Sequence, residues 1–466
     1  MSKTFRPYEL NQRLLLPPDL REWLPEGHLA LFVSDVVDAL DLSAIFQSYE
    51  QGDGRGQPPY DPALMVKLFV YAYCTGTPSS RKIERATYQD VAYRVLAADQ
   101  HPDHASIAEF RKRHLAALAA LFVQVLRLCQ AAGLVKLGHV AVDGTKVKAN
   151  ASKHKAMSYG RMEAAERKLE EEVQELLEQA QAVDAAEDAR YGQGQRGDEL
   201  PAELARRESR LRKIREAKAA LEHEATAQAE AAAAAAQAKI AERQRYEAKT
   251  GQKAKGRAPT VPDPTQARPE AKAQRNFTDP DSRIMKDGAT KAFEQAYNAQ
   301  VAVDSQAQVI VAAAVTQEAN DKQQLVPMLV AVADNTGQLP EKASADTGFF
   351  SEANVMDKQV AGVDLYVPPE RPPRTAPVTV VPAEGASPEG AGREQMRHKL
   401  KTPEGHALYK LRKAIVEPVF GQIKEERGFR RFSFRGLAQV AAEWTLICLT
   451  HNLLKLFRGR TGLRAA

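Results

Sequence analysis

The sequence has few cysteines, no long hydrophobic run and no secretory signal. Its 466 residues include 3 Cys, an odd number spaced far apart, which argues against a disulfide framework and against a zinc knuckle. The longest apolar runs, such as residues 325–333, fall well short of the ~18 residues that cross a bilayer. The start of the chain is polar and lacks the apolar core of a signal peptide. We therefore expect a protein of the reducing cytoplasm with no membrane partner.

No sign of charge dominates the whole chain, but the charge is unevenly distributed. The net charge is +5, whereas residues 397–466 alone contain 15 Lys and Arg against 5 Asp and Glu. A local basic surface of this kind is typical of a protein that binds a polyanion. The hydrophobic fraction of 44% and the charged fraction of 27% are ordinary for a globular protein.

The first part of the chain, residues 1–135, is expected to be helical. Residues 62–73 are apolar on most sides and predict a buried helix, and residues 81–96 predict a charged one. Ser106 and Glu109 have the spacing of a capping box, which would start a further helix at about residue 107. Short helices of this kind fit a helix-turn-helix module that binds DNA, and they fit a helical bundle without a ligand equally well.

Strand-like and helical patterns alternate in the second half of the chain. The apolar runs that predict strands are residues 138–142, 297–303, 309–315, 342–345 and 365–367. The segments that predict helices are residues 321–332, 409–426 and 436–457. Residues 368–392 are rich in Pro, Gly and Ala and predict a disordered loop.

A long insertion separates the first two predicted strands. Residues 155–275 are rich in Ala, Glu, Gln, Arg and Lys, with leucines at helical spacing, and residues 192–201 interrupt the pattern. This composition predicts an antiparallel hairpin of two long helices, a coiled-coil insertion without chemistry of its own. The strands at 138–142 and 297–303 are expected to pair as neighbours in spite of it.

Three carboxylates lie at the edges of these elements. Asp143 ends the first strand, Asp346 follows the fourth, and Glu417 lies on a late helix. Each of them alone could be a turn residue or a solvated helix residue. Together they supply the oxygen ligands that a hard cation such as Mg²⁺ takes. Two such ions a few ångströms apart can promote phosphodiester cleavage.

The helix that carries Glu417 adds basic residues to this picture. Lys413, Glu417 and Lys424 share one helix face, which could be an ion-pair ladder or a metal ligand between two phosphate contacts. Pro418 predicts either a kink or a helix that begins there with Glu417 as its N-cap. Phenylalanines that could stack on bases or belong to the core alternate with the arginines Arg427, Arg430, Arg431 and Arg435.

At these residues the chain resembles a known family. The matching stretches include HPDHASIAEFRKRH, HVAVDGTKVKANAS, FEQAYNAQVAVD, ADTGFFSEANV and YKLRKAIVEPVFGQIKEERGFRRFSFRGL. In this order they are similar to the DDE transposases of bacterial insertion sequences, in the branch with a long insertion after the first aspartate. The resemblance covers nearly all of the chain except residues 155–275 and 368–392.

The resemblance implies a fold and a domain organisation. The expected fold is α/β, with a ribonuclease H-like mixed sheet and flanking helices, an N-terminal all-α domain and a helical-hairpin insertion. The DNA-binding helical domain would span residues 1–135. The catalytic domain would combine residues 136–154 with 276–466, and the insertion would span residues 155–275.

The resemblance also implies site residues. Asp143, Asp346 and Glu417 would be the catalytic ligands of two divalent ions, Mg²⁺ or Mn²⁺. Related transposases carry a Tyr-x2-Arg-x3-Glu-x6-Lys signature, and this chain has one extra residue before Glu417. Either Lys413 takes the role of the arginine or the local helix differs. The residues implied to contact DNA are Tyr409, Arg412, Lys413, Lys424, Arg427, Arg430 and Arg431.

The implied activity is DNA transposition in the bacterial nucleoid. The protein would bind the terminal inverted repeats of its element as a homo-oligomer, cleave phosphodiester bonds and join the 3′ ends to target DNA. Two alternatives remain open at the level of the sequence. One is a metal-dependent nuclease without strand transfer, and the other is an inactive DNA-binding remnant.

Overall fold

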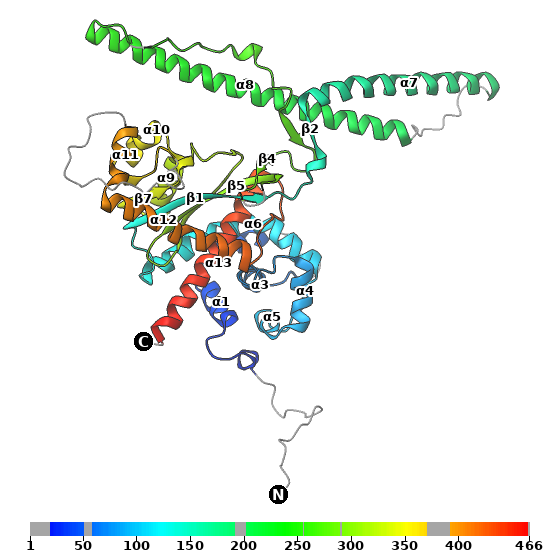
Figure 1. Ribbon diagram of the computed structural model, residues 1–466. Helices are drawn as coiled ribbons and strands as arrows, with labels where there is room; N and C mark the ends of the chain where they lie inside the picture. Colours follow the sequence, from blue (N-terminus) through cyan, green and yellow to red (C-terminus); the bar gives the residue numbers. More distant parts are fainter. Residues whose placement is uncertain are drawn as a thin grey trace, which may run out of the picture. The chain divides into compact units, whose positions relative to one another are not determined.

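The computed structural model describes residues 19–50, 58–191, 202–254, 256–288, 291–370 and 392–464 (Figure 1). It contains two compact units, one made of Met1–Val147 with Asn298–Ala466 and the other of Lys148–Tyr297. The helices expected at the start of the chain therefore share a unit with most of the strands. The interruption expected at 192–201, and all but the ends of the loop expected at 368–392, lie outside the described residues.

The first unit contains a mixed sheet, as the sequence predicts. In spatial order its strands are β6 (Ile310–Thr316), β5 (Phe293–Asp304), β1 (His139–Lys148), β7 (Lys342–Ala345) and β8 (Asp364–Tyr366). β1, β7 and β8 are parallel, and β5 is antiparallel to β6. Val140, Ala141 and Val142 have no exposed surface, which explains why this strand is apolar without alternation.

β1 and β5 are neighbours although the long insertion separates them in sequence. At one end the N–H of Ser305 donates to the carbonyl of His139, and at the other the N–H of Ala149 donates to the carbonyl of Gln295. The two ends pair in opposite order, so the strands run antiparallel. The predicted pairing is therefore confirmed.

The start of the chain is helical, as expected, with two corrections. Its helices are α1 (Leu29–Asp38), α2 (Ser43–Glu50), α3 (Pro62–Cys74), α4 (Ser80–Gln89), α5 (Val91–Leu96) and α6 (His104–Ala131). The single helix expected at 81–96 divides at Asp90, which caps α5. The helix expected at 107 begins at His104, because Asp103 accepts the N–H groups of Ala105 and Ser106 and so replaces the predicted capping box.

The last helix, α13 (Leu437–Arg464), connects these helices to the sheet. It packs against α3, α6 and β6. Trp444, fully buried, donates its Nε1–H to the carbonyl of Gln300 at 3.0 Å. Asn452 bonds to both backbone groups of Ile310 at 2.8 Å. α6 is long and apolar enough to cross a membrane by length and composition alone, and its contacts with α13 explain that apolarity as core packing.

The remaining helices of this unit are α9 (Leu325–Thr336), α10 (Glu352–Val355), α11 (Gly392–Lys401) and α12 (Pro403–Gly421). α12 continues directly into a π-helical turn, Gln422–Glu426. Pro418 lies inside α12, so Glu417 is an interior helix residue and the alternative of an N-cap at Glu417 is wrong. The N–H of Arg427 donates to the carbonyl of Gln422, five residues earlier, which defines the π turn.

The second unit consists mainly of two long helices, α7 (Tyr159–Tyr191) and α8 (Ala202–Thr250), which pack together. Beside them lie a small antiparallel pair, β2 (Ala156–Ser158) and β3 (Gln274–Asn276), and the strand β4 (Arg283–Lys286). β4 pairs with residues 293–296 of β5.

Polar contacts give the direction of the helix pair. Tyr159 bonds to Glu222 at 2.7 Å, Glu166 pairs with Lys218 at 2.9 Å, and Glu172 pairs with Arg207 at 2.9 Å. Residue numbers rise on α7 while they fall on α8, so the helices are antiparallel, as expected for a hairpin. Between them lies a buried apolar cluster that includes Met162, Leu169, Leu211, Ile214 and Leu221.

Acid should destabilise the first unit through His451 on α13. This side chain is buried, and its Nε2–H donates to the carbonyl of Gln308 at 3.0 Å. Burial, together with the nearby charge of Arg427, lowers the pKa of His451 to about 3 from 6.5. The unfolded chain binds a proton that the folded chain does not, so stability falls as the pH drops from about 6.5 towards 3, by up to about 1.4 kcal/mol per pH unit from this group.

Urea unfolding measured across this pH range checks the prediction. His451→Gln should flatten the pH dependence, whereas His154→Gln, which changes an exposed histidine, should leave it as in the wild type. Equal pH dependence in the wild type and in His451→Gln would contradict it.

Candidate active site

The register of β1 and β7 places two aspartates side by side. Val142 lies opposite Ala345 in this parallel pair, so the next residues, Asp143 and Asp346, are neighbours as well. The sequence predicts that Asp143 ends its strand, but β1 continues to Lys148, so Asp143 lies inside β1 and only Asp346 follows its strand. Each carboxylate is oriented by a backbone N–H just after it. Asp143 Oδ1 accepts the N–H of Gly144 at 2.8 Å, and Asp346 Oδ1 accepts the N–H of Gly348 at 2.7 Å.

The charge of Asp143 is only partly balanced. Burial raises its pKa to about 6 with a smaller contribution from the neighbouring charge of Asp346, although Arg412 on α12 acts in the opposite direction. The guanidinium of Arg412 pairs with Asp143 Oδ2 at 2.7 Å. Two carboxylates that repel each other at a buried strand edge favour a cation between them.

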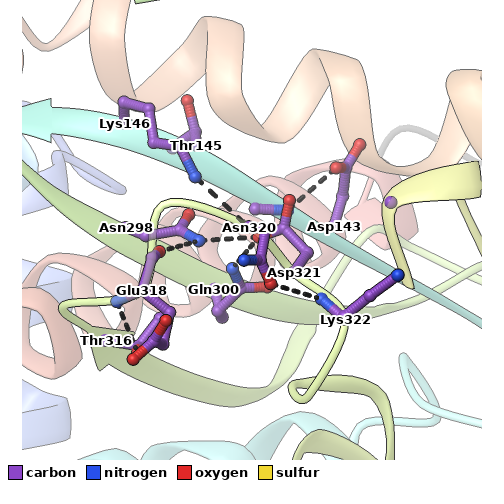
Figure 2. Close-up of polar contacts among 12 residues, drawn as sticks. Asp143, Thr145, Lys146, Asn298, Gln300, Thr316, Glu318, Asn320, Asp321 and Lys322 are labelled. Carbon is purple, nitrogen blue, oxygen red and sulfur yellow. Dashed lines mark hydrogen bonds and ion pairs between the residues drawn. The ribbon is translucent and has the colours of Figure 1, made fainter. Parts of the chain in front are cut away.

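A third aspartate, Asp321, lies close to Asp143 (Figure 2). Its Oδ1 accepts hydrogen bonds from Asn298 Nδ2 and Gln300 Nε2, both at 2.6 Å. Lys146 Nζ lies 3.9 Å from the same oxygen. Burial lowers the pKa of Lys146, and the charges of Asp321, Asp346 and Asp143 all counteract this, so the ammonium group is attracted by all three carboxylates.

Gly144 makes room for Asp321. A Cβ added at Gly144 would lie 2.3 Å from Gln300 Nε2 and 2.8 Å from Asp321 Oδ1. A Cβ added at Gly348 would lie 3.6 Å from Asp321 Oδ2, which is an ordinary contact. The carboxylate of Asp321 therefore lies near the glycines that follow Asp143 and Asp346, and a side chain at position 144 would displace it.

Helix α12 and the π turn lie against the same stretch of β1. Arg412 reaches Asp143, and Lys424 in the π turn donates its Nζ–H to Thr145 Oγ1 at 2.6 Å and to the carbonyl of Lys146 at 2.7 Å. Glu417 lies between these two anchors, and its side chain is exposed. In the part of the chain that the structure describes, no three His, Cys, Asp or Glu side chains are close enough to hold a metal ion. The structure thus brings Asp143 and Asp346 together, and Glu417 is not joined to them.

The other residues implied by the resemblance have different surroundings. The guanidinium carbon of Arg412 lies 5.9 Å from the ring centroid of Tyr409. These two residues of the signature are therefore close together in the structure. Lys413 and Arg431 are exposed. Arg430 is exposed and pairs with Glu425.

Arg427 requires a correction, because it does not lie on the surface. Its side chain is 7% exposed and donates to Thr450 Oγ1 at 2.8 Å. Burial lowers its pKa to about 10. The neighbouring phenylalanines are core residues as well: Phe429 stacks on Tyr73 and Phe432 meets Trp444 edge-on. Arg427 therefore joins α13 to the π turn and is not available to DNA phosphates in this structure.

Sequence analysis did not identify Asp321, Asn298 or Gln300. The available signal was in the second predicted strand, where two amides two residues apart interrupt an apolar run. Side chains at i and i+2 lie on the same face of a strand, and both of these amides are fully buried. A buried pair of amides requires a polar partner, and Asp321 is that partner.

Comparison with known proteins agrees with the resemblance seen in the sequence. A family model described as Transposase domain (DUF772) matches residues 18–113, and a second, described as Transposase DDE domain, matches residues 387–457. The second match contains Arg412, Glu417 and Lys424. No curated protein and no solved structure matches the chain significantly. The two family matches support a DDE transposase of an insertion sequence.

Removing the carboxylate of Asp321 should destabilise the first unit. Asp321→Ala leaves the buried amide of Gln300 without this acceptor, whereas Asn298 keeps its bond to the carbonyl of Glu318. We expect a loss of about 1–3 kcal/mol in the free energy of unfolding. Asp321→Asn should lose less, because its side-chain oxygen still accepts a hydrogen bond.

Chemical denaturation measures both variants against Asp334→Ala, which removes an exposed carboxylate from α9. An equal free energy of unfolding for Asp321→Ala and Asp334→Ala would contradict this prediction, because it would show that the hydrogen bonds to Asp321 do not stabilise the protein.

Proposed function

We propose that the protein is a transposase that binds the terminal inverted repeats of its own element, cleaves the DNA and joins the 3′ ends to target DNA with two divalent metal ions. The observation that carries this proposal is the pair of neighbouring carboxylates on adjacent parallel strands, Asp143 and Asp346, inside a chain that matches transposase domains over residues 18–113 and 387–457. Acting on bacterial DNA, it would work in the cytoplasm at the nucleoid.

The fold supports the proposal. A mixed sheet with β1 at its centre, flanked by helices and interrupted by an insertion after the first aspartate, fits a ribonuclease H-like catalytic core. The two helices of residues 155–275 pack on each other around their own apolar cluster, which supports a coiled-coil insertion. The matched residues 18–113 support assigning the reading of the terminal repeats to the N-terminal helices.

The chemistry of the residues present fits hard divalent cations. Asp143 and Asp346 supply carboxylate oxygens at one edge of the sheet, and the raised pKa of Asp143 reflects burial and the repulsion of a neighbouring anion. Mg²⁺ and Mn²⁺ prefer such oxygen ligands. When bound, the ions supply the activation of a water or a 3′-hydroxyl and the stabilisation of the leaving oxygen.

Glu417 is the proposed third ligand because of where its helix lies. Arg412 and Lys424 hold α12 and the π turn against residues 143–146 on either side of it. The side chain of Glu417 is exposed and pairs with no cation among the described residues, so it can turn between rotamers. Asp143, Asp346 and Glu417 together form the proposed metal-binding set.

Arg412 has a double role in this proposal. In the structure its guanidinium neutralises Asp143. With a divalent ion held by Asp143, Arg412 would be available to contact a DNA phosphate together with Tyr409 beside it. Lys413, Lys424, Arg430 and Arg431 are the further proposed phosphate contacts, and Arg427 is left out because it is buried.

Replacing the proposed metal ligands tests the function. Asp143→Asn, Asp346→Asn and Glu417→Gln should each lower Mg²⁺-dependent cleavage of DNA from the flanks of the reading frame by at least about 100-fold, because even the outer partners of metal ligands are worth 10–100-fold. Binding of the same DNA should persist, since it depends on phosphate contacts elsewhere. Gel analysis of cleaved strands and a mobility-shift assay give the two readouts.

Asp334→Asn is the control, because it removes an exposed carboxylate that lies on α9. Cleavage at the wild-type rate in any of the three ligand variants would remove that residue from the set. Products that join the element end to a supercoiled plasmid separate a transposase from a nuclease without strand transfer. Two ends held in one complex, measured by light scattering, would test the proposed homo-oligomer.

A further inference from the structure

The second unit contains a cavity of about 720 Å³ beside the helical hairpin. It is lined by the segment that leads into α7, by the first turn of α7, by one face of α8 and by the residues after β3. All of these segments belong to Lys148–Tyr297. The cavity contains none of the proposed metal ligands and none of the DNA contacts implied by the resemblance.

The cavity is strongly cationic. Its basic lining residues are His154, Lys155, Arg161, Arg206, Arg210 and Lys213. All six are exposed, and none of the described lining residues is Asp or Glu. Within the described part of the chain, the arginines and lysines of this set form no ion pair with a carboxylate, so their charge is available to a ligand.

The basic residues of α8 are sorted onto two faces. Arg207, Arg215 and Lys218 pair with glutamates of α7 and hold the hairpin together. Among the described residues Arg206 and Arg210, four residues apart on the cavity face, form no such ion pair, although the charge of Arg210 contributes to the lowered pKa of Glu172. Like charges at this spacing weaken a helix.

The floor of the cavity is rigid. Ile214 is 1% exposed and belongs to the buried cluster between α7 and α8, and Met157 and Phe277 pack against the same cluster. Cations projecting from a fixed floor lose less freedom on binding than cations on a mobile loop. This arrangement is a preorganised site for negative charge.

We propose that this cavity binds the phosphate backbone of double-stranded DNA, as a contact separate from the cleavage site. From Arg206 to Lys213, α8 advances about 10 Å, which matches about three phosphates of one strand at 3.4 Å per charge along the helix axis. The hydroxyl of Ser209 lies on the same face and is a further donor to phosphate oxygen. The insertion is thus a clamp on DNA independent of base sequence, a role that goes beyond the proposed function.

The test measures binding of a random-sequence DNA duplex to the full-length protein by fluorescence anisotropy over a range of salt concentrations. EDTA is present, so the readout does not depend on cleavage and the proposal can fail without the proposed catalytic function failing. The combined variant Arg206→Ala, Arg210→Ala, Lys213→Ala should bind about 10-fold more weakly or worse at low salt. The slope of log K against log salt should fall by about 2 to 3, because three phosphate contacts are lost.

The matched control removes three other exposed cations from the same helix, as Lys239→Ala, Arg245→Ala, Lys249→Ala, and should keep the wild-type slope. Ser209→Glu, which places a negative charge in the cavity, should weaken binding, whereas Ala238→Glu outside it should not. Circular dichroism verifies that each variant keeps its helix content.

Equal loss of slope in both triple variants would overturn the proposal, since it would show general attraction to a basic helix. An unchanged slope in the cavity variant would also overturn the proposal and would mean that the cavity binds another partner. This holds whether or not light scattering shows a change of oligomeric state.

Discussion

The parallel pairing of β1 with β7 determines where the charged groups of the active site lie. It places Asp143 and Asp346 at one edge of the sheet without any contact between their own side chains being required. Asp143 lies in β1 and Asp346 directly follows β7, and the residues before them, Val142 and Ala345, are fully buried, so the backbone holds the two aspartates near each other. The fold therefore has to place groups around them that stabilise two adjacent negative charges.

That requirement explains the basic residues around the pair. Arg412 approaches from α12 and Lys146 from β1 itself. Asp321 adds a third negative charge, but it also holds the amides of Asn298 and Gln300. Low dielectric strengthens each of these interactions. The charged residues of this cluster are therefore electrostatically coupled, so a substitution of one of them alters the interactions of the others.

The sequence predicted those features that arise from local patterns. Each strand contains an apolar run, and Asp143 and Asp346 stand where such runs end, so their closeness could be foreseen. The continuation of β1 from Asp143 to Lys148 could not, because most of those residues are polar. The role of Asp321 could not, because it depends on two amides of β5 that meet it only in the folded chain. At Arg427 the sequence suggested a DNA contact that the structure does not show. Alternating Arg and Phe residues are typical of a nucleic-acid-binding surface, and they also fit a buried core. Only the packing of Trp444 and Tyr73 against Phe432 and Phe429 decides between them.

The π turn after α12 also makes the length of the chain critical at this point. A π turn contains one more residue than the α-helical turn it replaces. Loss of the single codon for Gln422 would therefore leave a regular α-helix and keep the reading frame. It would also rotate Lys424 by about 100° around the helix axis, away from Thr145 and the carbonyl of Lys146. Homologous chains with a one-residue deletion here would need a different residue to anchor this helix to β1.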